Sequence, residues 1–266
     1  MEYAVKSGIP EKQRSACVVV GVFESRRLST AASRLDEASG GFLTQLLRRG
    51  DMDGRAGQTL MLTNVPEMVC DRILLVGCGR ERDFGDRAYN QAVTAAAVAL
   101  QESGAVEAIS YLSDLPVKGR DNAWRVRAAV LTTANALYRF DHLKTDPEKP
   151  RRPLRKLTVS VPGRRELPAG ERAVAEGRAI ANGMALAKDL GNLPGNICTP
   201  TYLAEQAEAL AKEFPALKVE VLGPEGHGGA RHGRPARRRP GQPPGAAADT
   251  RCVTTAAPAV TSPTPW

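Results

Sequence analysis

Few residues of this chain have the types and spacing that chemistry requires. Gly77-Cys78-Gly79 follows an apolar run, where a phosphate-binding turn could lie. The dinucleotide fingerprint would need a third glycine at position 82, which is Arg82, and no Gly-Lys-Ser/Thr follows. We therefore expect a simple exit from a strand here, with no nucleotide or other cofactor bound.

Metal-ligating side chains are equally sparse. His227 and His232 are five residues apart, off a common helical face, and lie in a Gly/Pro-rich segment without further ligands. The 5 Cys form no C-x-x-C pair, and their number is odd. A zinc ribbon or disulfide framework is therefore not expected, and reduced thiols are typical of a cytosolic protein.

The basic character of the chain is concentrated near its carboxyl end. Segment 223–266 holds six Arg against Glu225 and Asp249, a net +4 and half of the formal +8 of the whole chain. Arg237-Arg238-Arg239 could attract phosphate, but no aromatic residue is interleaved before Trp266 to stack on bases. A solvated charge run is favoured. A non-enzymatic interaction or nucleic-acid-binding domain using this tail remains the alternative, and steep salt dependence of binding would distinguish it.

The elements that would position such residues follow an α/β pattern. Hydrophobic residues make up 42% and aromatic residues 5%, so the core must be mostly aliphatic. Strands are expected at 17–23, 59–65, 73–76, 106–112 and 157–161. Helices are expected at 28–39, 41–49, 86–103 and 121–140. This alternation predicts an α/β domain with a mixed or largely parallel sheet.

A charged, Pro-rich connector at 145–153 precedes a long helix, expected at 169–190. Arg172 and Glu176 can pair along this helix. Apolar or small residues recur on one face at steps of three and four: Ala173, Gly177, Ile180, Met184, Ala187 and Leu190. A helix at 200–214 and a strand at 217–222 then look like the opening of a second α/β domain.

The two helices meet at Lys188–Thr201, K-D-L-G-N-L-P-G-N-I-C-T-P-T. Each Pro disfavours helix in the residue before it, while Thr199 is a good N-cap and Pro200 suits the first helical position. The run Ala181–Ala207 around this junction closely resembles the entry to the catalytic domain in the leucyl (cytosol) aminopeptidase family, which are two-metal exopeptidases. Upstream text fits the same family: G-V-F-E at 21–24, L-L-R-R-G-D at 46–51, G-Q-T-L at 57–60 and R-I-L-L-V-G at 72–77.

The resemblance covers about residues 1–222. It implies an N-terminal, macro-domain-like α/β domain at 1–162, a linker helix at 163–190 and the incomplete start of a catalytic domain at 191–222. It also implies a metal-dependent hydrolase that removes N-terminal residues from peptides, uses two divalent ions (Mn or Zn) and assembles as a homohexamer. The chain has no apolar run of the ~18 residues that span a membrane and no visible secretory signal, so no membrane partner and a cytoplasmic location are expected.

The family's chemistry is not carried over to this chain. The family's metal-binding signature reads N-T-D-A-E-G-R-L, whereas Ala175–Arg178, A-E-G-R, follows Arg172-Ala173-Val174 and lacks the ligand Asp. A solvated helix face is expected there. The remaining ligands, a catalytic Lys and an Arg lie in the family beyond the equivalent of position 222, and none is present here. We assign no catalytic, metal or cofactor-binding residue, and expect an inactive chain, without bound metal and with doubtful hexamer formation.

Segment 223–266 contains no Leu, Ile, Met, Phe or Tyr, so it cannot bury enough apolar surface to offset its ordering entropy. It is expected to be disordered. One permitted encoding of Arg231–Gly241, read one nucleotide later, gives G-M-G-A-L-L-A-V-A-R, which resembles the family's own sequence. We therefore expect a truncated, frameshifted aminopeptidase. A third possibility, an independent small-ligand-binding α/β domain, has no site that the sequence reveals.

Overall fold

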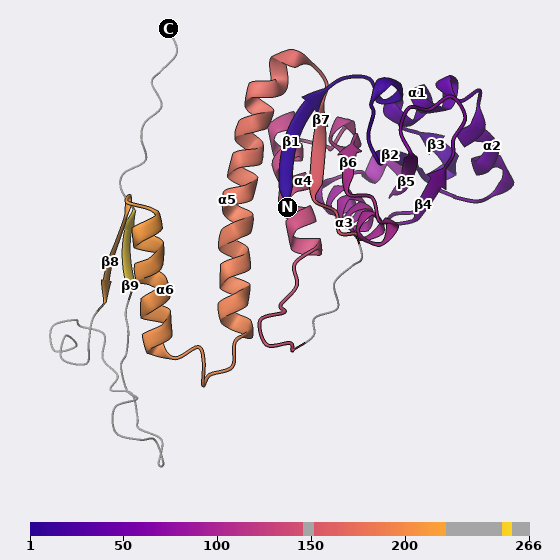
Figure 1. Cartoon of the computed structure of the whole chain (residues 1–266). Coiled ribbons are helices and arrows are strands. Elements are labelled where there is room, and N and C mark those ends of the chain that lie inside the picture. The colour runs from indigo at the N-terminus through magenta and orange to yellow at the C-terminus, as the bar shows by residue number, and fades with distance from the viewer. Residues whose placement is uncertain (146–151, 222–251, 257–266) are drawn as a thin grey trace, which may run out of the picture. The chain divides into compact units, whose positions relative to one another are not determined.

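The computed structural model describes residues 1–145, 152–221 and 252–256. The chain divides into two compact units, residues 1–186 and residues 187–266 (Figure 1). Within the described residues, no helix is long and apolar enough to cross a membrane.

The first unit is built on one mixed sheet. Its strands run in the order β1-β7-β6-β2-β5-β4, with the short β3 beside β2. β1, β7, β6, β2 and β5 are parallel to one another, whereas β4 pairs antiparallel with β5 and β3 pairs antiparallel with β2. The bounds are β1 Glu2–Ser7, β2 Val18–Phe23, β3 Arg27–Leu28, β4 Thr59–Thr63, β5 Arg72–Gly79, β6 Glu107–Ser110 and β7 Lys156–Val161. The predicted α/β class and mixed sheet are confirmed.

Helices cover both faces of this sheet (Figure 1). α1 and α2 pack on one face, and α3, α4 and the first part of α5 pack on the other. The α-helices are α1 Thr30–Ala38, α2 Phe42–Arg49, α3 Asp86–Ser103, α4 Asn122–Ala136 and α5 Leu167–Asn192. Short 3-10 turns are η1 Pro10–Lys12, η2 Glu24–Arg26, η3 Glu81–Asp83, η4 Leu112–Asp114 and η5 Arg164–Glu166.

The continuous apolar runs form the central strands because both faces of those strands are covered. In β5, Ile73 and Leu75 join the cluster beneath α1 and α2, whereas Leu74 and Val76 join the cluster beneath α3. All four side chains are 0% exposed. A run without polar alternation is what a parallel strand between two helical layers requires.

Strand β1 was not expected from the sequence. It pairs in parallel with β7, with Val5 opposite Val159, and forms one edge of the sheet. Its ends carry the exposed Glu2 and Lys6, and only its middle packs on the core. An edge strand with charged residues and only a partly buried middle gives little periodic signal.

The first half of α5 packs tightly on the N-terminal unit. Ala173 and Val174 are buried against α4 and β7. A Cβ on Gly170 would lie 2.9 Å from Val5 Cγ1, and one on Gly177 would lie 3.0 Å from Val130 Cβ. Glycine lets the helix approach this closely. The proposed division at 162 and 190 stays a prediction.

Two details of α5 differ from the expectation. Glu176 pairs with Arg127 of α4 at 2.7 Å, while Arg172 Nε donates to the Pro168 carbonyl, because a cation on the facing helix lies within reach of Glu176. The predicted apolar face is buried only in its first half, because Ile180 and Met184 are 46% and 43% exposed.

The second unit contains α6, Pro200–Glu213, and β8, Leu217–Val221. Thr199 caps α6 as predicted, accepting a hydrogen bond from the Tyr202 amide at 3.2 Å. β8 pairs antiparallel with β9, Cys252–Ala256. The prediction of a disordered tail is therefore wrong at these five residues. β8 has an open edge to pair with, and the β-branched run Val253-Thr254-Thr255 favours a strand. The rest of segment 223–266 lies outside the described residues.

Candidate functional site

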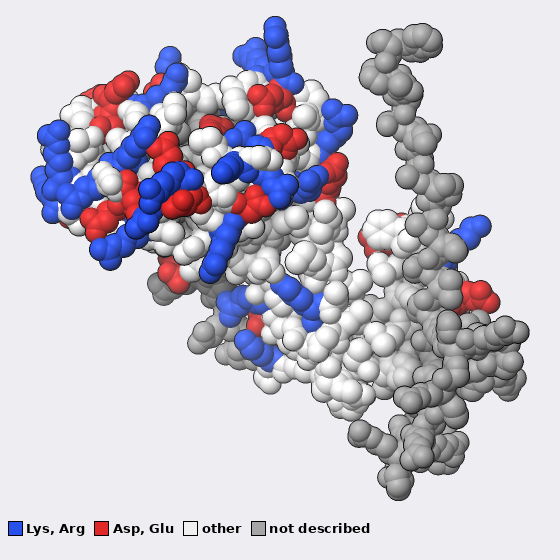
Figure 2. Space-filling model, turned by 180° about the vertical axis from the view of Figure 1, so that it is seen from behind, with Lys and Arg blue, Asp and Glu red and all other residues white. Residues whose placement is uncertain are grey.

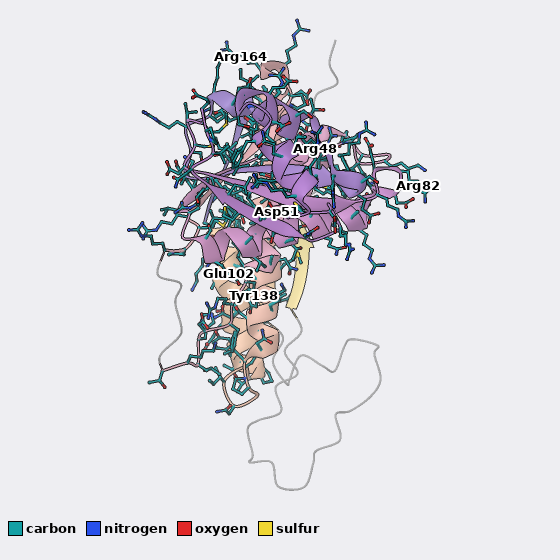
Figure 3. The ribbon with its side chains drawn as sticks, turned by 90° about the vertical axis from the view of Figure 1, so that its right-hand side faces the viewer. Arg48, Asp51, Arg82, Glu102, Tyr138 and Arg164 are labelled. Atoms are coloured by element: carbon teal, nitrogen blue, oxygen red, sulfur yellow. The ribbon has the colours of Figure 1, made fainter. Side chains whose placement is uncertain are left out.

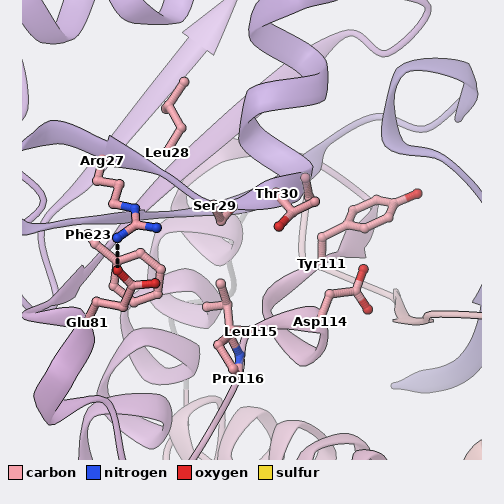
Figure 4. Close-up of a pocket in the computed structure, with 11 residues that line it drawn as sticks. Phe23, Arg27, Leu28, Ser29, Thr30, Glu81, Tyr111, Asp114, Leu115 and Pro116 are labelled. Atoms are coloured by element: carbon pink, nitrogen blue, oxygen red, sulfur yellow. Dashed lines mark hydrogen bonds and ion pairs between the residues drawn. The ribbon is translucent and has the colours of Figure 1, made fainter.

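A pocket opens at the carboxyl ends of the central parallel strands (Figure 4). β2 and β6 pair only at Val18–Ile109 and Val19–Ser110. β6 then ends at Ser110 and turns into η4, while β2 continues to Phe23. The strands therefore separate, and the space beyond Ser110 is left for the loops that follow them.

This position is the topological switch point of the sheet. After β2 the chain passes to α1 on one face, and after β6 it passes to α4 on the opposite face. The two connections leave a crevice between them, and open α/β sheets bind ligands in such crevices. The pocket lies where this rule places a site.

The pocket has a volume of about 120 Å³ and is lined entirely by residues of the first unit. Ser29 and Thr30 lie on one side and Leu115 and Pro116 on the other in Figure 4. The complete lining is Phe23, Arg27, Leu28, Ser29, Thr30, Ala31, Glu81, Tyr111, Asp114, Leu115 and Pro116.

Asp114 is a titratable residue of the lining, and its carboxylate is bonded to β7. Its Oδ2 accepts a hydrogen bond from Ser160 Oγ at 3.1 Å, whereas Oδ1 is buried without a protein partner. Burial raises the pKa of Asp114 to about 6, against the opposing effects of the Ser160 hydrogen bond and the Arg125 charge. Glu166 adds a smaller rise in that pKa. An ionised carboxylate without a full set of donors is costly to bury, so the charged form of Asp114 is disfavoured here.

The opposite wall is the first turn of α1. Ser29 is its N-cap, with Oγ accepting from the Ala32 amide at 3.2 Å, and the Ser29 carbonyl accepts from Ser33 N at 2.8 Å. The first amides of any helix have no partner within the helix. Thr30 and Ala31, the first two residues of α1, line the pocket.

Charged side chains and a strained turn form the mouth. Arg27 donates to Glu81 across it (Figure 4). Just before it, Ser25 and Arg26 have φ values of 64° and 63°. Non-glycine residues adopt this left-handed conformation at a cost, and such residues concentrate at functional sites.

Gly77-Cys78-Gly79 forms the last three residues of β5, whereas the sequence predicted that the strand had already ended at Val76. Gly57 N donates to the Gly77 carbonyl at 2.9 Å, and Gly79 N donates to the Gly54 carbonyl at 2.9 Å, so loop 54–57 lies directly against the end of β5. Cys78 is buried, and burial raises the pKa of its thiol to about 12, which leaves it without a reactive thiolate.

The remaining sequence candidates are dispersed. In A-E-G-R, Ala175, Glu176 and Arg178 are exposed, as expected of a solvated helix face, while Gly177 is buried against α4 and Glu176 pairs with Arg127 on the surface. Among the described residues, no three His, Cys, Asp or Glu side chains converge as a metal site would require. The described residues therefore do not supply the ligands that a two-metal site needs. His227, His232 and Arg237–Arg239 lie outside the described residues.

The surface of the first unit carries charges of both signs. On the face seen in Figure 2, Lys and Arg are interspersed with Asp and Glu. In Figure 3, Arg82 of η3 and Arg164 of η5 lie at the margins of the unit. Several of these charges pair on the surface, among them Arg80–Glu24 at 3.2 Å and Arg120–Asp86 at 2.6 Å.

The comparison with known proteins identifies this fold. Residues 19–147, which include β2 to α4 and the pocket, match the cytosol aminopeptidase family, N-terminal domain. The chain belongs to the cytosol aminopeptidase family. It is 58% identical over 222 residues to a probable cytosol aminopeptidase of Thioalkalivibrio sulfidiphilus and 56% identical over 224 residues to one of Halorhodospira halophila. Each match covers 84% of this chain and 45% of the relative, so the chain spans about half the length of these relatives.

Solved structures agree on the fold of this aminopeptidase-family chain. A mutant tomato leucine aminopeptidase superposes with a TM-score of 0.67 at 22% identity, covering 85% of this chain and 45% of that one. The bottromycin maturation enzyme BotP in complex with Mn superposes with a TM-score of 0.60 at 24% identity, covering 80% and 39%. At these identities the likeness concerns the fold alone.

Sequence reasoning missed the pocket, although it placed most of its walls correctly. Its residues come from three separate post-strand segments, 23–31, 81 and 111–116. Only the strand order brings them together. The pocket could have been predicted from the positions at which the apolar strand runs end, because parallel sheets bind ligands beyond the carboxyl ends of their strands.

Replacing Asp114 by Asn should stabilise this family member at neutral pH. The folded pKa of about 6 lies above the ordinary value of about 3.9, so the folded state binds this proton more tightly. The contribution of Asp114 to the free energy of unfolding is therefore greatest below about pH 4 and is lost as the pH rises through about 6. Asp114→Asn should gain roughly 1–3 kcal/mol in urea unfolding at pH 8 and less at pH 5.

The exposed Asp51 gives the control, because Asp51→Asn should leave stability unchanged at both pH values. A variant at 114 that is destabilised equally at both pH values would show that the carboxylate is needed structurally.

Proposed function

We propose that this chain is the N-terminal part of a leucyl-aminopeptidase-type hydrolase. The whole enzyme would remove N-terminal residues from peptides, use two divalent ions such as Mn or Zn, and act in the cytoplasm as a homohexamer. The observation that carries the proposal is the 58% identity over 222 residues to a probable cytosol aminopeptidase. That match is longer than the 186 residues of the first unit, so it extends into the second unit.

In this proposal the first unit does not itself cut peptides. Two-metal hydrolysis requires several carboxylates converging on ions roughly 3.5–4 Å apart. The carboxylate that most resembles a family ligand, Glu176, is held by Arg127 on the surface of the unit. The role of residues 1–222 is then to supply the N-terminal domain and the linker to a catalytic domain.

The full chain should therefore release no leucine from leucine p-nitroanilide or Leu-Gly peptides, with or without added Mn²⁺ or Zn²⁺. The Thioalkalivibrio relative, assayed in parallel, gives the positive control. Turnover that stays with the chain through repeated purification would contradict the proposed division of roles.

A chimera tests the other half of the proposal. Residues 1–222 joined to the remaining part of the Thioalkalivibrio protein should give metal-dependent peptidase activity. Its kcat/KM should lie within about tenfold of that relative, which corresponds to a rise of no more than ~1.4 kcal/mol in the activation free energy. A folded but inactive chimera would show that this N-terminal part cannot serve such an enzyme.

A further inference from the structure

We propose that segment 115–118 is a pH-sensitive switch, which Arg125 holds in place while Asp114 is protonated and releases when Asp114 is ionised. Leu115 and Pro116 of this segment line the pocket, so the switch decides whether that wall is firm. The proposal concerns the first unit alone and does not depend on the proposed hydrolase.

One side chain of α4 holds the segment. Arg125 Nη1 donates a hydrogen bond to the Leu115 carbonyl at 2.8 Å. At the other end of the segment, the Lys118 amide donates to the Phe84 carbonyl at the longer distance of 3.3 Å. A hydrogen bond from a charged donor is the stronger kind, so the Arg125 bond is the firmer of these two attachments.

Two buried polar atoms beside this bond have no hydrogen-bond partner among the described residues. One is Oδ1 of Asp114, the residue directly before Leu115, and the other is Nε of Arg125 itself. Asp114 Oδ2 accepts a hydrogen bond from Ser160 Oγ at 3.1 Å. A neutral carboxyl group tolerates this environment, whereas a buried carboxylate needs further donors. The observed arrangement therefore suits the protonated acid.

Ionisation of Asp114 changes which acceptor the guanidinium of Arg125 prefers. A carboxylate is a stronger acceptor for a guanidinium group than a neutral carbonyl is. When the Asp114 proton passes to water, Arg125 turns from the Leu115 carbonyl to Asp114 Oδ1. This exchange gives both unpartnered atoms a partner and breaks the bond that holds Leu115, so the segment is released. Two discrete arrangements of one charged pair are what a switch requires.

Charged groups from two further elements act on Asp114. Burial raises its pKa to about 6, against the Ser160 hydrogen bond and the charge of Arg125, and Glu166 of η5 adds a smaller rise. Glu166 is itself bonded to the side-chain amide of Asn122. The segment should therefore be held below about pH 6 and released as the pH rises through that value.

The other titratable groups near Asp114 do not change charge in this range. Burial raises the pKa of Tyr89 in α3 and of Tyr111 before η4, so both remain neutral. Arg27 and Glu81 line the pocket as well, but they pair with each other. The titration near pH 6 is therefore assigned to Asp114.

Hydrogen–deuterium exchange of the full 266-residue chain at pH 5 and pH 8 tests the switch, with rates corrected for the intrinsic pH dependence of exchange. Peptides covering 112–120 should lose about tenfold in protection at pH 8, because the pKa falls from about 6 toward the ordinary value of about 3.9 on release. Peptides covering 72–79, in the buried strand β5, should keep their protection and so report that the unit stays folded.

Two variants fix the switch in opposite states. Asp114→Asn cannot ionise, so peptides 112–120 should be protected at both pH values. Arg125→Gln removes the guanidinium, so the same peptides should exchange fast at both. Asp51→Asn, an exposed residue outside the pocket lining, should respond to pH as the unmodified chain does.

Three results would overturn the proposal. The first is equal protection of peptides 112–120 at pH 5 and pH 8 in the unmodified chain. The second is a loss of protection that peptides 72–79 share, because that is global unfolding. The third is a pH response that Asp114→Asn retains. None of these needs Arg125→Gln, so they decide the matter even if that variant does not fold.

Discussion

Gly77→Ala should unfold or severely destabilise the N-terminal unit, by about 3–5 kcal/mol. A Cβ at this position would lie 1.9 Å from the Arg55 carbonyl oxygen and 2.9 Å from its carbon. The obstacle is backbone, which cannot rotate away as a side chain can. Relief would require loop 54–57 to move, and that would break the hydrogen bonds from Gly77 N to Gln58 O, 2.7 Å, and from Gly57 N to Gly77 O, 2.9 Å.

Urea unfolding followed by Trp124 fluorescence measures this loss. A Trp266→Phe background leaves Trp124, which contacts Tyr89 in the core of the unit, as the sole reporter. Gly163→Ala is the matched control, because Gly163 has extended backbone angles, φ −153° and ψ 162°, and nothing lies within 4 Å of the added Cβ. Equal stability of the two variants would show that the 54–57 loop does not press on β5.

Val5→Asp should cost the N-terminal unit about 2–4 kcal/mol. Val5 lies opposite Val159 in the β1/β7 pair and belongs to the cluster that β7, α4 and α5 share. Its Cγ1 is the atom closest to where a Cβ on Gly170 would lie, at 2.9 Å. A carboxylate here would lose water against an apolar surface without a cation to pair with, and would loosen α5 together with β1.

The control is Lys6→Asp, which introduces the same side chain one residue along the same strand. Lys6 is exposed, and successive residues of a strand point to opposite faces, so this variant should change stability by no more than about 0.5 kcal/mol. Trypsin digestion gives a second reading, since loosening α5 should speed cleavage after Arg172 and Arg178 only in Val5→Asp. Similar losses in both variants would indicate that β1 does not hold α5.

Most elements of the first unit followed from local pattern. The run at β2 has no polar residue, the alanine-rich segment at α3 has an apolar face, and Asp121 caps α4 by accepting from Trp124 N at 2.8 Å. These signals are local, because hydrophobic period and capping chemistry act within one or two turns of chain. Strand ends were less certain: β5 runs to Gly79, past the Val76 expected, because loop 54–57 supplies its last partners.

Assigning the chain to the aminopeptidase family also needed only the sequence. Four short segments and the 181–207 junction agreed in order with that family, and the comparison confirmed it. Several separate segments that agree in order with one family identify it more strongly than a single motif does, because each segment belongs to a different element of the fold. The expected absence of catalytic and metal residues stays a prediction, as does the frameshift, whose segment is largely outside the described residues.

The sequence by itself thus determined the α/β class, the position of most elements and the family. Tertiary structure alone decided that Glu2–Ser7 is a strand, that Glu176 pairs with Arg127, and that segments 23–31, 81 and 111–116 meet around one pocket. The physical reason is sequence separation. Pairing and burial between residues tens of positions apart depend on strand order, and no local pattern encodes the order β1-β7-β6-β2-β5-β4.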